Sequence, residues 1–334
     1  MSRAGLLFAG APSVPDMVAT ARRAEAAGFE SVWVAETRLT RDAFVPAAAI
    51  AQATENIRVG TGIVNVYTRN AVLVALSFVS LAELAPGRIL MGLGTGSPLV
   101  LAPQGVPFTR PLRRLKAFCD VVPRLVRGEA VTFEGEGVTL AGARIEDLLT
   151  TGDGPAAGAR GLPLHLGVTG PRALEYAGEV ADGVLLNACL STAYVERARG
   201  LIARGAERAG RSAGAVEVAM AIVASPHEDS RTGRDGARRF IALYLSTFPN
   251  IARETEVPEE QVAAMRQALG RDGLEAAAAL VGDDVVDTLA VAGTPAECRA
   301  RLDAYRAAGV AVTVLAPVDG ALERAVDLLA PAPV

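Results

Sequence analysis

Side chains that carry acid–base or covalent catalysis are scarce in this sequence. It contains two histidines, His165 and His227, and three widely separated cysteines, Cys119, Cys189 and Cys298. A Ser-His-Asp triad would need one of the two histidines, and a zinc site is disfavoured because no CxxC motif occurs. The scattered cysteines indicate no disulfide framework. Scarce acid–base groups suit hydride transfer, in which a cofactor carries the difficult chemistry.

Two segments that follow predicted strands contain polar groups suited to a ligand site. Glu36 stands where a carboxylate can exchange a proton with a bound ring, although it could also be a solvated loop carboxylate paired with Arg38 or Arg41. In Gly60–Asn70 (GTGIVNVYTRN), the glycines permit close approach of a ligand, and Asn65 and Tyr67 add polar groups. An ordinary turn that ends in a capping asparagine explains the second segment equally well.

A phosphate site is predicted at Leu166–Arg172 (LGVTGPR), where a glycine-containing turn leads into a helix. Backbone N–H groups at a helix start bind phosphate, and Thr169 and Arg172 add a hydroxyl group and a positive charge. The alternative is a helix start without a ligand. Asn187 follows the next strand and could face the same ligand. Asp182 precedes that strand and is expected to be structural, and His165 lies within a strand and is expected in the barrel interior.

Short apolar runs alternate with amphipathic stretches along the chain, which is typical of repeated βα units. The predicted strands are 4–9, 31–35, 57–61, 88–92, 163–167, 183–186, 216–223 and 311–315. The predicted helices are 13–27, 42–54, 70–84, 112–127, 171–180, 192–210, 294–308 and 322–329, with several more between 231 and 282. Ser13, Asn70 and Thr294 are the expected N-caps.

The alternation is interrupted at about 94–161, where we expect an insertion after the fourth strand. This segment begins with a loop rich in Gly, Pro and Thr and contains a predicted hairpin at 130–140. Long loops in a compact domain commonly form active-site walls. We therefore predict a single domain, 1–334, that carries this insertion.

Eight strands that alternate with helices favour a closed α/β barrel, the (β/α)8 or TIM barrel, in which active sites lie at the carboxyl ends of the strands. The alternative is a doubly wound sheet, suggested by the glycines at 92, 94 and 96. Their GxGxG spacing is not the dinucleotide-binding GxGxxG, and they open a long loop instead of a helix.

Composition restricts the partners and the location. The net charge is −4 and no basic stretch occurs, so nucleic acid is not expected to bind. The apolar runs are too short to span a membrane, and no signal-peptide pattern opens the chain. We therefore expect a cytoplasmic protein.

Three segments together resemble the luciferase-like monooxygenase superfamily: AAGFESVWVAET, IRVGTGIVNVYTRNAVLVALSFVSLAELAPGRILMGLGTG and LPLHLGVTGPRALEYAGEVADGVLLNA. Within it, the chain is most similar to the branch that uses the deazaflavin coenzyme F420, which includes the methylenetetrahydromethanopterin reductases. The resemblance implies a cis peptide bond at Gly62–Ile63, in a bulge behind the deazaflavin ring, and Glu36 near that ring. The other cofactor-lining residues that it implies are Val64, Asn65, Thr95, Gly96, Gly167, Thr169, Gly170, Asn187 and Ala188.

Two departures from the family pattern narrow the expected reaction. Thr37 replaces a histidine implicated in proton handling by alcohol-oxidising relatives, and Leu7 replaces a glutamate of the methanopterin reductases. We therefore expect an F420H2-dependent reductase acting on a C=N or C=C bond of a small molecule or modified peptide, with Glu36 or Tyr67 as proton donor. The alternatives are an FMN-dependent monooxygenase that uses O2 and a non-catalytic cofactor-binding protein. The resemblance also implies a homodimer, and no metal is expected.

Overall fold

Parallel strands close into a barrel in the computed structural model, which describes residues 3–10, 12–36, 39–146 and 161–331. Around the barrel the order is β1, β2, β3, β5, β8, β9, β10 and β12, and β12 pairs with β1 again. The strands are β1 (Arg3–Phe8), β2 (Ser31–Val34), β3 (Arg58–Thr61), β5 (Ile89–Gly94), β8 (Leu164–Gly167), β9 (Gly183–Leu186), β10 (Glu217–Pro226) and β12 (Val312–Pro317). The predicted (β/α)8 barrel is confirmed.

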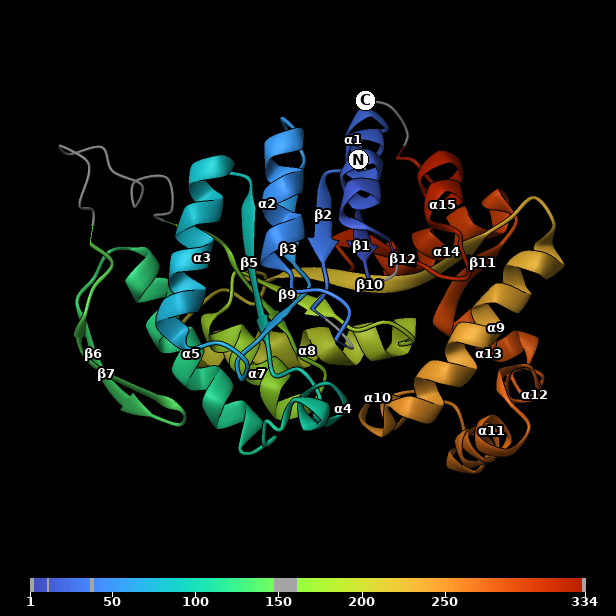
Figure 1. Ribbon diagram of the computed structural model, residues 1–334. Helices are drawn as coiled ribbons and strands as arrows, with labels where there is room; N and C mark the ends of the chain where they lie inside the picture. Colours follow the sequence, from blue (N-terminus) through green and yellow to red (C-terminus); the bar gives the residue numbers. More distant parts are fainter. Residues whose placement is uncertain (1–2, 11, 37–38, 147–160, 332–334) are drawn as a thin grey trace.

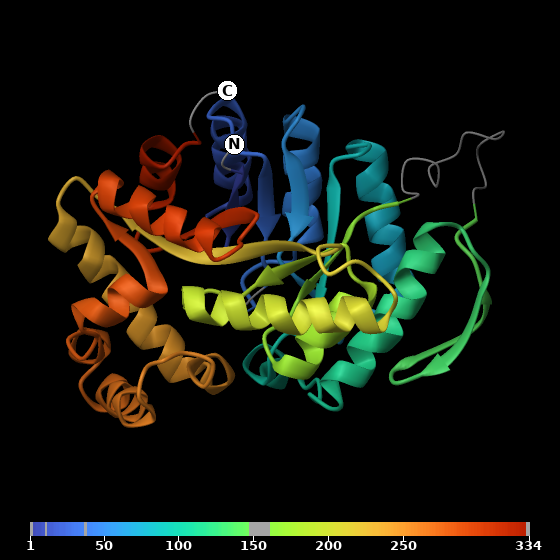
Figure 2. The ribbon, with the colours of Figure 1, turned by 180° about the vertical axis from the view of Figure 1, so that it is seen from behind.

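Helices surround the barrel on its outer face, as Figure 1 and the reverse view in Figure 2 show. The Ser13 and Asn70 side chains accept backbone N–H groups at two helix starts, and Thr294 forms a capping box with Glu297. All three predicted N-caps are therefore confirmed. The surrounding helices are α1 (Val14–Ala26), α2 (Phe44–Ala53), α3 (Ala71–Leu84), α5 (Pro111–Val126), α7 (Pro171–Val180), α8 (Thr192–Arg208), α14 (Pro295–Ala307) and α15 (Leu322–Leu328).

The segment between β5 and β8 contains more than one helix. It includes α4 (Pro98–Leu101), a 3-10 turn (Ala102–Gln104), α5 and the antiparallel pair β6 (Val131–Gly135) and β7 (Val138–Ala143). The predicted hairpin is thus confirmed. Residues 147–160 of the predicted insertion lie outside the described residues.

A second extended segment follows β10 and consists of helices. These are α9 (Ser230–Thr247), α10 (Pro249–Ala252), α11 (Glu259–Arg271), α12 (Leu274–Ala278) and α13 (Asp283–Leu289). They lead into β11 (Ala290–Gly293), a strand that the sequence pattern did not predict. One edge of β10 pairs with β9 at residues 217–220 and with β11 at residues 223–226. This second partner extends β10 beyond the end of β9.

Apolar side chains fill the barrel between its two ends. Trp33, Leu90, Leu185, Ala219, Val312 and Val314 form one buried cluster, against which Leu7 and Ile63 pack. Gly60 makes room for the Trp33 ring, since a Cβ atom at this position would lie 2.5 Å from Trp33 Cε3. The barrel interior is therefore a packed core and not a channel.

Charged side chains close the amino-terminal end of the barrel. Arg3 pairs with Glu30 and Glu217, and Arg58 Nη2 lies 2.7 Å from Glu30 Oε1. His165, inside the barrel as predicted, packs edge-on against Trp33, and its Nε2 lies 3.8 Å from Glu217 Oε1. We call these five residues, Arg3, Glu30, Arg58, His165 and Glu217, the barrel-base cluster. Asp182 is structural at the same end, because its Oδ2 accepts the Leu164 N–H at 2.8 Å.

None of the helices in the described ranges is long and apolar enough to cross a membrane.

Candidate active site

The carboxyl end of β3 carries the backbone feature that the family resemblance implies. The peptide bond between Gly62 and Ile63 is cis. Beyond it the chain resumes as β4 (Val64–Asn65), which pairs with the end of β5. The cis bond is a confirmed prediction, and it places Ile63 at the carboxyl-terminal mouth of the barrel.

The Ile63 side chain forms an apolar surface across this mouth. A Cβ atom at Gly94 would lie 2.7 Å from Ile63 Cγ1, and one at Gly167 would lie 2.8 Å from Ile63 Cγ2. At Gly62 it would lie 3.0 Å from Leu7 Cδ1 and 3.2 Å from Leu185 Cδ2. The ends of β5 and β8 thus need glycine where Ile63 packs on them, and the result is an apolar floor for a flat ligand.

Glu36 lies beside this floor in a hydrogen-bonded ion pair. Its Oε2 accepts from Asn65 Nδ2 at 2.9 Å, and its Oε1 lies 2.5 Å from Arg69 Nη1. The Glu36 side chain is 11% exposed, and that of Arg69 is 18% exposed. Asn65 is itself fixed, because its Oδ1 accepts the N–H groups of Tyr67 and Thr68. Two predicted site residues, Glu36 and Asn65, are therefore in direct contact. Thr37 and Arg38 lie outside the described residues.

Tyr67 is held by neighbours from the segment after β5. Its hydroxyl donates to the Thr109 carbonyl at 2.7 Å, and its ring packs between Phe108 and the Arg114 guanidinium. Burial raises the pKa of the Tyr67 hydroxyl. Because the hydroxyl hydrogen of Tyr67 is engaged in a hydrogen bond to a backbone carbonyl, Tyr67 is less suited than Glu36 to protonate a substrate.

Thr95 and Gly96 form the turn that leaves β5. Gly96 has a φ of +65°, which favours glycine, and a Cβ atom there would lie 3.0 Å from Asn65 Cβ. The turn thus packs against the residue that holds Glu36. Thr95 itself is only weakly tied down, since its hydroxyl lies 3.4 Å from the Gly96 carbonyl oxygen.

The predicted phosphate segment leads into α7 with space around it. Gly170 is the N-cap of this helix; it provides no side-chain cap, and a Cβ atom there would have no described atom within 4 Å. The preceding turn is fixed because the Tyr194 hydroxyl donates to the Thr169 carbonyl at 2.7 Å. Arg172 is exposed in the first turn of α7. A helix start with open space and a nearby guanidinium fits an anionic group.

Asn187 follows β9 and continues the inward-facing positions of that strand. Leu185 belongs to the barrel interior, so alternation directs the side chain two residues later toward the mouth. Asn187 Oδ1 accepts from the Tyr244 hydroxyl at 2.6 Å and from the Ala188 N–H at 2.8 Å. Ala188 is buried, 5% exposed, and supports Asn187 through this backbone group.

The structure adds three residues to the predicted site: Arg69, Tyr194 and Tyr244. Arg69 stands within the GTGIVNVYTRN segment, so the motif contained a signal for it. Tyr194 and Tyr244 are 25 and 57 positions away from their partners Thr169 and Asn187, and no local pattern indicates these contacts.

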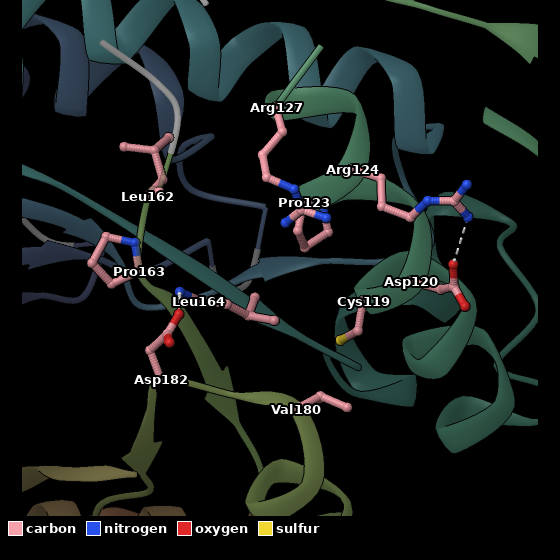
Figure 3. A pocket seen from close by; sticks show the side chains of 11 residues that line it. Cys119, Asp120, Pro123, Arg124, Arg127, Leu162, Pro163, Leu164, Val180 and Asp182 are labelled. Atoms are coloured by element: carbon pink, nitrogen blue, oxygen red, sulfur yellow. Dashed lines mark hydrogen bonds and ion pairs between the residues drawn. The ribbon is translucent and has the colours of Figure 1, made fainter. Parts of the chain in front are cut away.

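A groove of about 680 Å³ lies at the other end of the strands (Figure 3). It is bounded by the carboxyl-terminal half of α5, including Cys119 and Arg124, and by Leu164 and Asp182 near the starts of β8 and β9. Arg124 is paired with Asp120 in this view. Because it opens at the amino ends of the strands, the groove is separate from the candidate site.

An eight-stranded barrel with an apolar floor, an ion-paired carboxylate and an open helix start at its mouth is suited to a flat ring that bears a phosphate. The model of one family, luciferase-like monooxygenase, matches residues 3–311. The chain belongs to this family.

Two relatives that carry enzyme names match most of the chain. The 5,10-methylenetetrahydromethanopterin reductase of Methanolobus tindarius is 31% identical over 328 residues, 97% of each chain. An F420-dependent glucose-6-phosphate dehydrogenase of Kineococcus radiotolerans is 30% identical over 285 residues, 78% of this chain and 81% of its own. The solved coenzyme F420 dependent tetrahydromethanopterin reductase from Methanopyrus kandleri superposes with a TM-score of 0.87 at 23% identity, covering 98% and 97% of the two chains.

The open space at Gly170 gives a direct test of the phosphate site. We expect Gly170→Val to weaken cofactor binding about tenfold or more, because the added methyl groups occupy space that a phosphate would use. The Gly170 backbone is extended, with φ −75° and ψ 153°, so valine fits it without strain. Titration of cofactor fluorescence measures the affinity. Gly214→Val is the matched control, since Gly214 also has open space but lies before β10, at the opposite end of the barrel. Equal affinities for both variants would remove Gly170 from the site.

Proposed function

We propose that this protein is an oxidoreductase that uses coenzyme F420 to reduce a C=N or C=C bond of a small-molecule or natural-product substrate. The observation that carries the proposal is the Ile63 floor, set into Gly94 and Gly167 beside the Glu36 carboxylate. The family and the F420-dependent relatives support the choice of cofactor.

The residues at the mouth fit a deazaflavin at two separate places. The apolar surface of Ile63 and Leu7 suits one face of a planar ring. The open start of α7, which follows β8, suits a phosphate group. When bound, the reduced deazaflavin supplies the hydride. The protein holds the ring and the substrate in the orientation that hydride transfer needs, excludes water and delivers the accompanying proton.

Glu36 is the group we assign to the proton. Reduction of a C=N or C=C bond adds a proton to the atom beside the reduced carbon, and a positioned carboxyl group can deliver it. Each carboxylate oxygen has two lone pairs, so the ion-paired Glu36 can take up a proton from water at Oε2, pass it to the substrate and still accept from Asn65. Arg69 and Asn65 fix the orientation of this group.

Reduction is favoured over alcohol oxidation by the residue types at two positions, Thr37 in the sequence and Leu7 beneath the floor. Thr37 has no titratable group to accept an alcohol proton. Leu7 makes the region under the ring apolar, whereas the family resemblance implies a glutamate at this position in methanopterin reductases. The substrate is therefore expected to differ from methanopterin.

Cofactor binding is the experiment that tests the proposal. The purified protein should bind F420, followed by its fluorescence, and should oxidise F420H2 when cyclic imines are added. Tight binding of reduced FMN with no affinity for F420 would overturn the proposal in favour of the FMN-dependent monooxygenase. Binding of F420 with no turnover across imines and enones would favour a non-catalytic cofactor-binding protein.

We also propose that a second copy of the chain covers the outer face of α2 and α3. These neighbouring helices are apolar around most of their circumference, and Glu83 is their only charged residue. A helix that is apolar on all sides is typically buried. Yet Val45, Leu73 and Leu76 are 63%, 48% and 43% exposed in the single chain.

A charge-introducing double variant tests this interface. We expect the wild-type protein to be a dimer at micromolar concentration and Leu73→Glu/Leu76→Glu to be a monomer, because two carboxylates would be buried without partners. Light scattering coupled to size-exclusion chromatography measures the mass. Leu280→Glu, at another exposed leucine, should remain dimeric. A monomeric wild-type protein would contradict the proposal.

A further inference from the structure

A ladder of aromatic rings lies along one face of α9. Phe240, Tyr244 and Phe248 follow one another at intervals of four residues, so they share a face. The ring centroids of Phe240 and Tyr244 are 5.1 Å apart with an interplanar angle of 18°, and those of Tyr244 and Phe248 are 4.6 Å apart. All three side chains are partly exposed.

This face of α9 is directed toward the barrel mouth. At Gly236, one turn before Phe240, a Cβ atom would lie 2.6 Å from Ser225 Oγ, near the end of β10, and 3.0 Å from Asp319 Oδ2, just after β12. At the next turns, Tyr244 reaches Asn187 beyond the end of β9. The helix therefore runs beside the ends of three strands (Figure 1). The contact between Tyr244 and Asn187 places its aromatic face at the side of the mouth.

The contact between Tyr244 and Asn187 determines which groups the asparagine offers to a ligand. Asn187 Oδ1 accepts both the Tyr244 hydroxyl and the Ala188 N–H, so both lone pairs of this oxygen are used. The orientation of the amide is thereby fixed. Its Nδ2 donates no hydrogen bond to any of the residues that the structure describes. Two N–H donors are thus left beside the aromatic wall.

We propose that Asn187, oriented by Tyr244 as a positioning residue, recognises a hydrogen-bond acceptor on the edge of a planar heterocycle bound at the mouth. The acceptor is a ring carbonyl oxygen or an imine nitrogen. This inference rests on the proposed function and extends it, because a planar conjugated ring is the ligand that an aromatic wall and an apolar floor both favour. The ring that carries the acceptor belongs either to the deazaflavin or to the substrate.

Asn187→Asp is the most specific test, because aspartate keeps both hydrogen bonds made by Oδ1 and replaces only the two donors. Because aspartate also carries a negative charge, a loss of affinity is attributed to the missing donors only where the uncharged variant Tyr244→Phe shows it too. Under the proposal, affinity for a ligand with an acceptor falls about tenfold or more. Tyr244→Phe keeps the aromatic ladder, releases the amide and should weaken the same ligand about three- to tenfold.

Two binding measurements distinguish the possible sources of the acceptor. The first follows F420 fluorescence on addition of protein. The second follows quinazolin-4-one, a flat bicycle with a ring carbonyl and an imine nitrogen, by saturation-transfer NMR on the F420-loaded protein. Naphthalene, of the same outline and without an acceptor, should bind all proteins alike. Tyr305→Phe is the matched control. The Tyr305 hydroxyl donates to the Leu190 carbonyl, in the segment between β9 and α8 that also contains Asn187, and makes no hydrogen bond to Asn187 in the described residues.

Each outcome bears on the proposal. Weaker quinazolinone binding in both variants assigns the acceptor to the substrate, and weaker F420 binding assigns it to the deazaflavin. Affinities for both ligands within twofold of wild type in both variants would overturn the inference. A wild-type protein that does not bind F420 would remove the proposed function separately, and the quinazolinone titration of the cofactor-free protein would still judge the role of Asn187.

Discussion

Replacing Glu36 with glutamine is expected to lower turnover about 100-fold while leaving F420 affinity within about threefold of wild type. Glutamine has the same shape and can still accept from Asn65 Nδ2, but its NH2 group then faces Arg69, so the ion pair is lost, and it cannot release a proton. Turnover requires the proton, whereas cofactor binding depends on the Ile63 floor and the start of α7. Steady-state kinetics and fluorescence titration measure the two quantities separately.

Two control variants distinguish loss of the proton donor at Glu36 from a general charge effect and from a role of Tyr67. Glu207→Gln removes an exposed carboxylate of α8 and should leave both quantities unchanged. Tyr67→Phe should lower turnover only a few fold, because the Tyr67 hydroxyl already donates to Thr109. A large loss in Tyr67→Phe together with a small loss in Glu36→Gln would make Tyr67 the proton donor. Small losses in both would mean that solvent supplies the proton.

Arg69 explains why the environment of Glu36 could not be derived from the sequence. A loop carboxylate beside Arg38 and Arg41 suggested local pairing, but the observed partner follows β4, 33 positions later. Parallel pairing of β2 with β3 brings the ends of these two strands together, and this makes the contact possible. The sequence thus predicted a polar residue at a strand end but did not identify the arginine that pairs with it.

Elements with a strong local signal were predicted from the sequence to within a few residues. The helix 171–180 and the strand 183–186 are observed with the predicted limits, because turn residues bound each apolar run. β11 was missed because Ala290–Gly293 directly follows α13 with no intervening turn residue. Its strand conformation depends on pairing with the far half of β10, which is a tertiary effect.

The site shows the same division between local and long-range information. Gly94, Gly167 and Gly170 could be identified as glycines near strand ends or helix starts. Why they must be glycine became clear only when Ile63 was found packed against the first two and open space was found beside the third. The aromatic ladder of α9 lies between 231 and 282, where the sequence predicted only that several helices occur. No pattern there indicated that Tyr244 would reach Asn187.

The barrel-base cluster leads to the second large effect, which is on stability. We expect Glu217→Gln to lower the free energy of unfolding at pH 7 by about 2 kcal/mol. The neighbouring His165 imidazole, together with Arg3 and Arg58, lowers the pKa of the Glu217 carboxyl from 4.5 to about 2, although partial burial opposes this shift. The value of about 2 kcal/mol is smaller than the full shift implies, because 26% of the Glu217 side chain is exposed to screening solvent.

The pH dependence identifies the origin of this stabilisation. Because the folded-state pKa lies below the unfolded value, the ionised Glu217 contributes fully above about pH 4.5, and this contribution is lost as the pH falls toward about 2. The stability difference between wild type and Glu217→Gln should therefore be largest near pH 7 and should shrink below pH 4.5, as measured by urea unfolding at pH 7, 5 and 4. Glu207→Gln, at an exposed position of α8, should show no such difference. A Glu217→Gln deficit that is constant across this range would indicate a packing effect instead of the ion pairs.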